Sequence, residues 1–313
     1  MKIFNNLATY KSNINTFVTL GTFDGVHVGH QKVIKNLVKS AALNNTNSVL
    51  LTFFPHPRMV LQKNTNIKLI NTIEERIKLF KKTGLDIVVI HKFTEEFSKQ
   101  TALDFVKTIL VNTLKISRLI IGYDHQFGKN RDGDFKQLET YGKILNFDVQ
   151  AIAQKDIDNS AVSSTKIREA IESGNIEKAN NYLGYNFMLT GEVVKGKKLG
   201  DKLGFPTANL SIKESYKLLP KTGSYIVKAE IENKTIFGMM NIGFRPTVSG
   251  KNQTIEIHFF DFNKDLYGKK IQVDVLKFLR NEQKFESVEN LKNQLQKDKE
   301  KSLEIISGLV FDS

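Results

Sequence analysis

The stretch Gly21-Thr-Phe-Asp-Gly-Val-His-Val-Gly-His30 lies between a short apolar run at residues 17–20 and an amphipathic segment at residues 31–42. The apolar run predicts a strand, and the apolar side chains along one face of the second segment predict a helix. Glycines let the backbone turn tightly and approach a ligand closely. The first turn of a helix offers unpaired N–H groups and the positive end of a dipole to an anion. The stretch therefore predicts a phosphate-binding turn between a strand and a helix.

Two histidines, His27 and His30, flank Gly29 where this helix begins. Imidazole rings at such a place can donate hydrogen bonds to an α-phosphate as charge develops on it, so positioning and electrostatics suffice for the transfer. Two other interpretations remain open: a glycine-rich turn with incidental histidines, and a zinc site made of His27, His30 and His56. We favour the phosphate site over zinc because the glycines already explain the loop.

The turn opens a half of the chain in which strands and helices alternate. The predicted elements, in chain order, are a strand at 17–20, a helix at 31–42, a strand at 48–54, a helix at 72–83, a strand at 86–90, a helix at 102–114 and a strand at 118–121. Thr72 and Glu75 form a capping-box pattern. Helices at 166–173 and 176–183 close this half. Alternation of this kind predicts βαβ units and a parallel sheet.

Three loops of this half carry side chains suited to binding a ligand. Thr52-Phe-Phe-Pro-His-Pro-Arg58 offers Phe54 to a ring and Arg58 to a phosphate. Gly122-Tyr-Asp-His-Gln-Phe-Gly128 follows a predicted strand, at the end where open α/β sheets bind ligands. Ser163-Ser-Thr-Lys-Ile-Arg168 combines hydroxyls, helix N–H groups and a guanidinium into a possible triphosphate clamp. Each is also compatible with an ordinary loop or helix cap.

The pattern changes near residue 185, where strands begin to follow one another. The predicted strands are 188–194, 225–231, 235–241, 254–260 and 271–279, and a helix at 288–306 ends the chain. Five or six antiparallel strands with one helix predict a small closed barrel. We expect the boundary between the two halves within residues 183–187.

The second half has its own candidate site. Gly204-Phe-Pro-Thr-Ala-Asn209 brings threonine and asparagine oxygens together, which are ligands suited to Mg²⁺. Glu256 alternates with Ile255 and Ile257 and so points to the other face of its strand. A glutamate on the interior face of a barrel can act as a general base, although an exposed strand residue is the simpler interpretation. The chain has no Gly-x-x-x-x-Gly-Lys-Ser/Thr loop, so a kinase here would lack that phosphate cradle.

Composition limits the class of protein. A chain of 313 residues is long enough for two domains. It has no cysteine, no apolar run long enough to span a membrane and no signal-peptide core, which favours a cytoplasmic protein. The net charge of +13 comes from dispersed lysines, without basic runs, so we expect a solvated surface rather than a nucleic-acid interface.

Taken together, these motifs resemble the prokaryotic bifunctional riboflavin kinase/FAD synthetase family. The resemblance covers nearly the whole chain and rests on nine segments in the expected order. They are residues 21–30, 53–58, 122–128, 163–168, 204–209, 241–247, 256–258, 267–268 and 280–285. Two segments depart from the family pattern. His125-Gln126 stands where Phe-Arg is common, and Asp201 follows Gly200 where Arg is common.

The resemblance implies a fold and a set of site residues. It implies an N-terminal nucleotidyltransferase-type domain with a Rossmann-like parallel sheet at residues 1–184, which adenylylates FMN to FAD. It also implies a six-stranded riboflavin-kinase barrel with a C-terminal helix at residues 185–313. The implied catalytic residues are His27, His30 and Glu256. The implied ATP-binding residues are Gly21, Phe23, Gly29, Ser164, Thr165, Arg168, Gly204, Thr207 and Asn209, the last two also binding Mg²⁺. The implied flavin-binding residues are Phe54, Asp124, Phe127 and Arg280.

The resemblance names riboflavin, FMN, FAD and ATP as partners, with no nucleic acid and no membrane, and leaves the oligomeric state open. Three alternatives are weighed against it. An adenylyltransferase for another phosphate, such as phosphopantetheine, would carry an unrelated β domain. A basic RNA-binding protein using the barrel would bind with steep salt dependence. An inactive FMN-sensing regulator would not need the catalytic residues.

Overall fold

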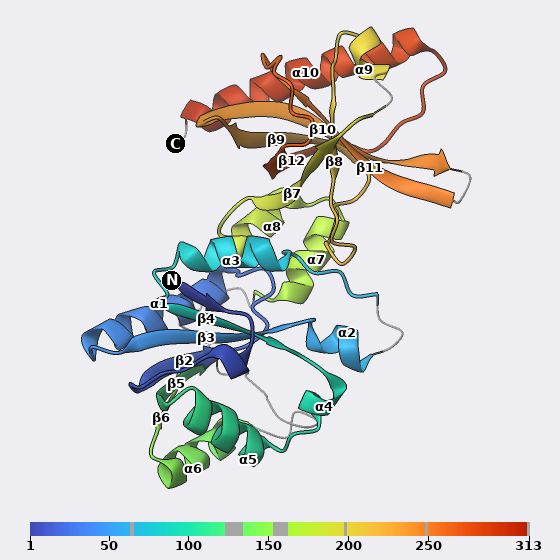
Figure 1. The fold of residues 1–313 in the computed structure, drawn as a ribbon. Helices are drawn as coiled ribbons and strands as arrows, with labels where there is room; N and C mark the ends of the chain where they lie inside the picture. Colours follow the sequence, from blue (N-terminus) through green and yellow to red (C-terminus); the bar gives the residue numbers. More distant parts are fainter. Residues whose placement is uncertain (63–65, 123–133, 153–161, 197–198, 248–249, 312–313) are drawn as a thin grey trace. The chain divides into compact units, whose positions relative to one another are not determined.

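The computed structural model describes residues 1–62, 66–122, 134–152, 162–196, 199–247 and 250–311. Contacts within the chain divide it into two compact units, Met1–Ser164 and Thr165–Ser313 (Figure 1). The first is a parallel α/β unit and the second contains a closed barrel, as the sequence predicted. The predicted domain boundary near residue 184 remains a prediction.

The first unit is built on a sheet of six parallel strands in the order β1-β4-β3-β2-β5-β6. The strands are β1 (Lys2–Phe4), β2 (Thr16–Leu20), β3 (Asn47–Phe54), β4 (Ile87–Lys92), β5 (Ile116–Gly122) and β6 (Asp148–Ile152). Every residue of β2 is buried, as expected for a strand covered on both faces. The strand order reverses at β2, so the end of β2 lies at the switch point where such sheets bind ligands.

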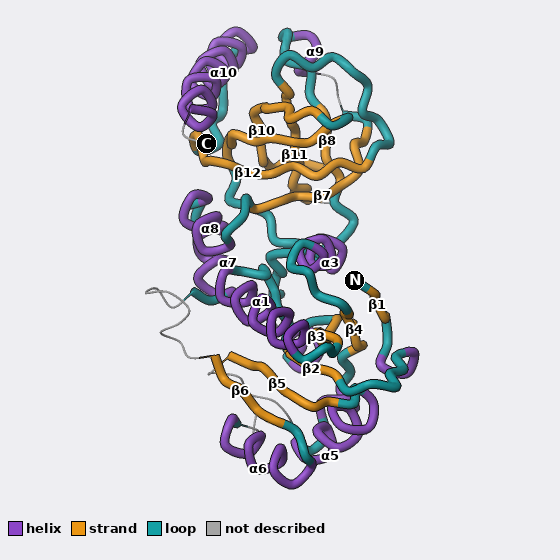
Figure 2. Tube along the Cα trace, turned by 90° about the vertical axis from the view of Figure 1, so that its left-hand side faces the viewer, coloured by secondary structure: helices purple, strands orange, loops and turns teal. Residues whose placement is uncertain are grey.

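Helices cover both faces of this sheet. Helix α1 (Val28–Leu43) lies on one face, whereas α5 (Ala102–Phe105) and α6 (Phe135–Leu145) lie on the other (Figure 2). Helix α3 (Ile73–Lys81) starts with the predicted capping box between Thr72 and Glu75. The short helices η1 (Leu7–Thr9), α2 (Pro57–Leu61) and α4 (Glu95–Ser98) complete the unit.

Several elements of this unit differ from the sequence prediction. The predicted helix at 102–114 is α5 followed by a π-helix, η2 (Val106–Thr113). The wider turn shows in the bond from the Leu114 amide to the Ile109 carbonyl, five residues back. Strands β1 and β6 and helix α6 were not predicted. β1 has only three residues, and β6 is an edge strand with exposed polar residues at alternate positions, so neither has a strong apolar signal.

The second unit begins with α7 (Ser164–Glu172, of which Ser164 belongs to the first unit) and α8 (Ile176–Leu183). Helix α8 is bonded to the barrel, because the Asn180 side chain accepts from the Phe187 amide at 2.7 Å and donates to the Val275 carbonyl at 3.0 Å. The barrel order is β10-β11-β8-β7-β12-β9. Its strands are β7 (Phe187–Val194), β8 (Ala208–Ser211), β9 (Gly223–Ile231), β10 (Lys234–Thr247), β11 (Gly250–Phe259) and β12 (Lys270–Arg280).

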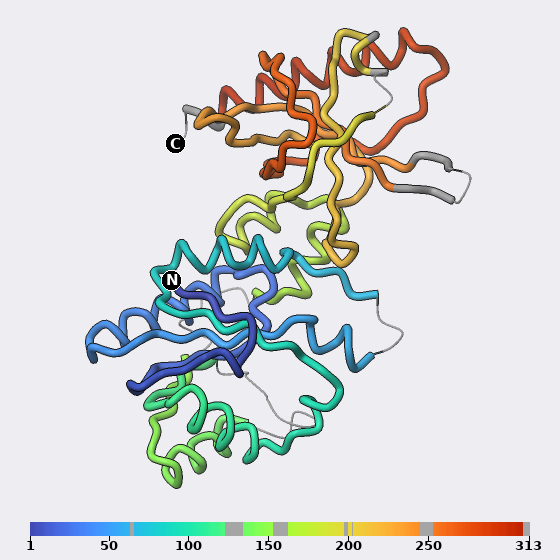
Figure 3. The backbone as a smooth tube through the Cα atoms, in the orientation of Figure 1, coloured from blue at the N-terminus to red at the C-terminus, as the bar shows by residue number. Residues whose placement is uncertain are grey.

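Two helices pack outside this barrel. These are the short α9 (Leu199–Lys202) and the long α10 (Val288–Phe311), whose connection from β12 can be followed in Figure 3. An apolar cluster on the outer surface lies beneath α10, and its buried members are Leu203, Phe205, Ile226, Met239, Phe260 and Ile306. The sixth strand, β8, is absent from the five strand ranges predicted from the sequence. β10 and β11 also extend beyond the predicted ends at 241 and 254, through a region whose Pro246 and glycines suggest a turn.

Candidate active sites

The loop from Gly21 to His27 leaves the central strand β2 in an unusual backbone conformation. Phe23, Gly25 and Val26 have φ angles of 50°, 86° and 36°. Positive φ is costly for Phe and Val, so surrounding contacts must hold them there. The buried Asp24 carboxylate accepts from the amides of Ile70 and Asn71 at 3.2 and 3.3 Å. These bonds fix the loop to the segment that precedes α3.

Three more hydrogen bonds fix the same loop. The Thr22 carbonyl accepts from Arg76 Nη1 at 2.6 Å and from the Thr52 hydroxyl at 3.2 Å. The Ser164 hydroxyl donates to the Asp24 carbonyl at 2.9 Å. The loop is therefore held from β3, from α3 and from Ser164, and it presents the histidines at a rigid position.

His27 and His30 form a stacked pair at the start of α1. Their ring centroids are 3.6 Å apart and their planes are 21° from parallel. His27 is the N-cap of α1, and its Nδ1 accepts weakly from the His30 amide at 3.4 Å. Because Nδ1 accepts, a neutral His27 ring carries its proton on Nε2.

The environment of His30 keeps its ring neutral. Burial lowers the pKa of His30 well below its ordinary value, and its electrostatic interactions with His27 and Arg76 lower the pKa further. The Phe23 ring packs edge-on against His30 at 5.0 Å between centroids. His30 Nδ1 is buried and has no hydrogen-bond partner among the described residues. A neutral imidazole at a helix N-terminus can donate to phosphate oxygens without repelling the second histidine.

Sequence reasoning missed two residues of this site, Asp24 and Arg76. Both are buried, with exposed fractions of 1% and 0%. A signal existed for Arg76, because it lies on the same face of α3 as Leu79 and Phe80, where a charge is out of place. Asp24 lies inside the quoted motif, but its partners are 46 and 47 residues away, so no local pattern reveals them.

The other residues predicted for the first site fall in different parts of the chain's structure. Gly21 and Gly29 lie in the loop and in the first turn of α1, and Phe23 is buried against His30 and Phe80. Phe54 ends β3 at the same edge of the sheet. Thr165 and Arg168 belong to the second unit, and Asp124 and Phe127 lie outside the described residues. The ATP and flavin contacts of all these residues remain predictions.

The second candidate site lies on β8 and β11 of the barrel. Glu256 pairs directly with Asn209 across these strands, so both side chains lie on one face. The Thr207 hydroxyl is 3.5 Å from Glu256 Oε2. Of the two positions that the sequence left open for Glu256, inside or outside the barrel, the structure has the outer one. Ile255 and Ile257 fill the interior with exposed fractions of 5% and 0%, which leaves Glu256 half-buried on the outer face.

A histidine holds the turn that carries Thr207. The buried His258 ring bonds through Nδ1 to the Pro206 carbonyl at 2.9 Å, and since a carbonyl only accepts, Nδ1 carries the proton. Burial lowers the pKa of His258, and the bond to Pro206 opposes this. Phe205 packs edge-on against the same ring at 5.2 Å. His258 stands two residues from Glu256 on the same strand face, so one strand positions both the turn and the candidate base.

Two glycines leave room for these groups. A Cβ on Gly196 would lie 2.1 Å from Asn209 Nδ2, and a Cβ on Gly200 would lie 2.2 Å from the Phe205 carbonyl oxygen. Side chains at either position would displace the turn or the amide. Hydroxyl and amide oxygens are the hard ligands that Mg²⁺ accepts. Thr207 and Asn209 therefore fit a magnesium ion held next to a nucleotide phosphate.

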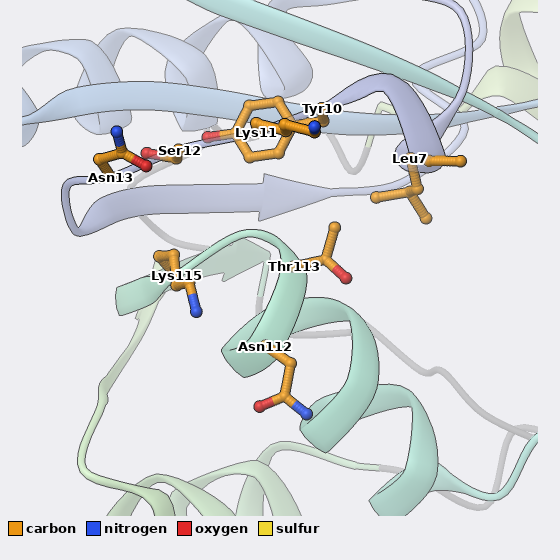
Figure 4. A pocket seen from close by; sticks show the side chains of 9 residues that line it. Leu7, Tyr10, Lys11, Ser12, Asn13, Asn112, Thr113 and Lys115 are labelled. Carbon is orange, nitrogen blue, oxygen red and sulfur yellow. The ribbon is translucent and has the colours of Figure 1, made fainter.

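Other features of the structure do not belong to these sites. Among the described residues, no group of three or more His, Cys, Asp and Glu side chains is arranged to hold a metal ion. A hollow of about 470 Å³ in the first unit is lined by Tyr10, Asn112, Lys115 and neighbours (Figure 4). It lies where β2 and β5 begin, whereas the Gly21–His30 loop follows the other end of β2.

Comparisons with known proteins match both halves of the chain. A family model of FAD synthetases matches residues 9–166, and one of riboflavin kinases matches residues 183–306. A protein of Buchnera aphidicola subsp. Schizaphis graminum named bifunctional riboflavin kinase/FMN adenylyltransferase is 40% identical, over 95% of this chain and 96% of that protein. A protein of the same name from Listeria monocytogenes is 36% identical, over 92% of each.

A solved structure is also similar to this chain over nearly its whole length. A crystal structure from Streptococcus pneumoniae, described as a macrolide-efflux protein, has a TM-score of 0.85 and 29% identity, over 95% of this chain and 97% of that one. That description concerns the S. pneumoniae protein. In the described parts of the present chain, no helix is long and apolar enough to cross a bilayer. The riboflavin kinase match of the second half also excludes an unrelated β domain. The chain thus belongs to the bifunctional riboflavin kinase/FMN adenylyltransferase family, as its sequence predicted, and it is an enzyme with an FAD synthetase domain followed by a riboflavin kinase domain.

Proposed function

We propose that the second unit transfers the γ-phosphate of ATP to riboflavin, and that the first unit transfers the AMP group of another ATP to the resulting FMN. The observation that carries the residue roles is the placement of Glu256 beside Thr207 and Asn209 on the outer face of the barrel. A carboxylate beside hydroxyl and amide oxygens supports these roles, because phosphoryl transfer to a hydroxyl uses a base close to the groups that hold the nucleotide.

In the kinase reaction, Glu256 accepts the proton of the 5′-hydroxyl of riboflavin. The hydroxyl oxygen bonds to the γ-phosphorus of ATP while the bond from that phosphorus to the β,γ-bridging oxygen breaks, which releases ADP. Thr207 and Asn209 hold the nucleotide and Mg²⁺. When bound, the ion neutralises charge on the phosphates. His258 keeps Thr207 in place through the Pro206 carbonyl.

In the adenylyl transfer, a phosphate oxygen of FMN attacks the α-phosphorus of ATP and pyrophosphate leaves. The proposed role of His27 and His30 is to donate hydrogen bonds to the α-phosphate from neutral rings. The N-terminus of α1 adds its dipole at the same place. By the family resemblance, the proposal also assigns ATP binding to Ser164, Thr165 and Arg168, and flavin binding to Phe54, Asp124 and Phe127. A cytoplasmic location is part of the proposal, because both reactions need ATP.

Product analysis tests the proposal. The full chain is incubated with riboflavin and MgATP, and separately with FMN and MgATP, and the flavins are separated by chromatography. We expect FMN with one ADP per FMN in the first case, followed by FAD, and FAD with one pyrophosphate per FAD in the second. Binding of FMN without any turnover would instead support a flavin-sensing regulator.

A further inference from the structure

A row of polar side chains extends from the candidate base across the outer face of the barrel. Strand pairing places Glu256 opposite Asn241, Asn241 opposite Ser224, and Ser224 opposite Arg280. Directly paired residues point to the same face of a regular sheet. The β12–β9 pairing has a register shift between Phe278 and Arg280, so the outward direction of Arg280 rests on its ion pair with Asp298 of α10, outside the barrel. Three strand spacings separate Glu256 from Arg280, or roughly 14 Å at about 4.8 Å per strand. Asn209 continues the row on the other side of Glu256.

The two sides of Glu256 differ in chemistry. Thr207 and Asn209, the proposed ATP and Mg²⁺ residues, lie on the β8 side. In phosphoryl transfer the attacking and leaving oxygens are roughly in line on opposite sides of phosphorus. The acceptor alcohol therefore enters from the β10 side of Glu256, towards Asn241, Ser224 and Arg280.

Arg280 ends the row in a buried ion pair with Asp298 of α10. Arg280 Nε lies 2.9 Å from both carboxylate oxygens of Asp298, and Nη2 lies 2.7 Å from Oδ2. The Arg280 side chain is 17% exposed and that of Asp298 is 5% exposed. Gln294 donates to Asp298 Oδ1 at 2.8 Å, and the Ser302 hydroxyl donates to the Asp298 carbonyl at 2.6 Å. The Asp298 carboxylate is thus held by Arg280 and Gln294, and it fixes the orientation of the guanidinium.

The same guanidinium organises the segment that follows β12. Arg280 Nη1 donates to the Asn281 carbonyl at 3.0 Å, and the guanidinium carbon is 5.9 Å from the centroid of the Phe285 ring. The Glu282 carboxylate occupies the space above Gly243 of β10, where Oε1 would be 2.5 Å from a Cβ. Residues 281–285 are therefore placed between α10 and β10, on the side from which the acceptor enters.

A buried ion pair contributes little net stability, because the desolvation of both charges offsets their attraction, but it does fix geometry. We propose that Asp298 is a positioning residue of the kinase reaction, which holds Arg280 and residues 281–285 in place on the riboflavin side of the site. This inference rests on the proposed function. Asp298 makes no contact with the reacting atoms and acts through Arg280.

The test replaces Asp298 in the full chain and uses the other activity as an internal control. For Asp298→Asn we expect the KM for riboflavin to rise about tenfold, while the KM for MgATP and the rate of FAD formation from FMN stay near the wild-type values. Gln294→Leu, a milder change that loosens Asp298, should raise the riboflavin KM about twofold to threefold. Glu232→Gln is the matched control, since it removes a carboxylate paired with Lys264 and Lys269 at the exposed surface of the same unit.

An unchanged riboflavin KM in both Asp298→Asn and Gln294→Leu would overturn the proposal. Equal increases in the KM values for riboflavin and MgATP would also overturn it, because they would show a general loss of structure in the barrel. Failure of the proposed function gives a different result, since the wild-type chain would then form no FMN. If Asp298→Asn does not fold, the Gln294→Leu result alone decides.

Discussion

At the scale of single residues, the histidine pair has to remain neutral to act as it is proposed to. His27 and His30 stack with centroids 3.6 Å apart, and two charged rings at that distance would repel each other. Burial and the neighbouring charge of Arg76 keep the pKa of His30 low. His30 is therefore held as an uncharged ring, and the dipole of α1 supplies the positive potential.

Replacing both histidines with alanine should abolish FAD formation and leave FMN formation nearly unchanged. The loss of a transition-state donor typically costs ~10²–10³-fold in rate. The measurement is the rate of each reaction in the same preparation, with FMN or riboflavin as substrate. Equal damage to both activities would show that the pair does not serve the adenylyl transfer alone.

The pKa of His30 also predicts how stability depends on pH. The folded pKa lies below the ordinary 6.5, so the unfolded chain takes up the proton first as pH falls. Above pH 6.5 the ring is neutral in both states, and the free energy of unfolding decreases as the pH falls below 6.5. Thermal unfolding at about pH 7.5 and about pH 5.5 should show a smaller decrease in Tm for His30→Gln than for the wild type. An equal decrease would exclude His30 as the source.

At the scale of elements, the kinase turn depends on the absence of side chains next to it. The Asn209 amide occupies the space beside Gly196, and the Phe205 carbonyl occupies the space beside Gly200. His258 of β11 also holds this turn, through its hydrogen bond to the Pro206 carbonyl. The turn is thus placed by three separate segments of the chain.

Gly196→Ala should weaken the kinase more than it weakens the fold. The new methyl group would displace the end of the Asn209 side chain, which can rotate away, so the proposed nucleotide and Mg²⁺ ligand is lost while the barrel stays intact. We expect the KM for MgATP to rise about tenfold in riboflavin phosphorylation, with a small change in Tm. Gly308→Ala is the control, since its Cβ would meet nothing within 4 Å. Unchanged kinetics in Gly196→Ala would remove Asn209 from the site.

The sequence predicted elements well where the apolar pattern is strong and poorly where it is not. Strand β2 and helix α8 agree within a residue because their apolar patterns are clear. β6 was missed because it is a strand of five residues at an exposed edge of the sheet, with few buried apolar residues. In the sites, motifs located the residues but not their partners. The bond from His258 to Pro206 spans 52 residues, and pairing Asn241 with Glu256 needs the strand register.

At the scale of the whole molecule, the Gly21–His30 loop lies in the first unit and Glu256 with its neighbours lies in the second. The contact division after Ser164 and the predicted boundary near 184 differ by the two helices α7 and α8. Asn180 of α8 bonds to the Phe187 amide and the Val275 carbonyl of the barrel. These bonds associate α8 with the kinase unit.

Two fragments test this arrangement. Residues 165–313 and residues 185–313 should both convert riboflavin to FMN and stop there. The shorter fragment should be less stable by about 1–3 kcal/mol, because loss of Asn180 leaves the Phe187 amide and the Val275 carbonyl without their partner. Urea unfolding and chromatography of the flavins measure both. A folded 165–313 fragment without kinase activity would show that the kinase site needs the first unit.

The most direct test of two independent sites in one chain is a mixing experiment. Glu256→Gln should phosphorylate riboflavin ~10²–10⁴-fold more slowly yet make FAD from FMN. The double variant His27→Ala/His30→Ala should make FMN and stop there. Given riboflavin and MgATP, neither protein alone should form FAD at an appreciable rate, whereas an equimolar mixture should form it, with FMN passing through solution. Absence of FAD from the mixture, or rapid FAD formation from riboflavin by Glu256→Gln alone, would contradict the account.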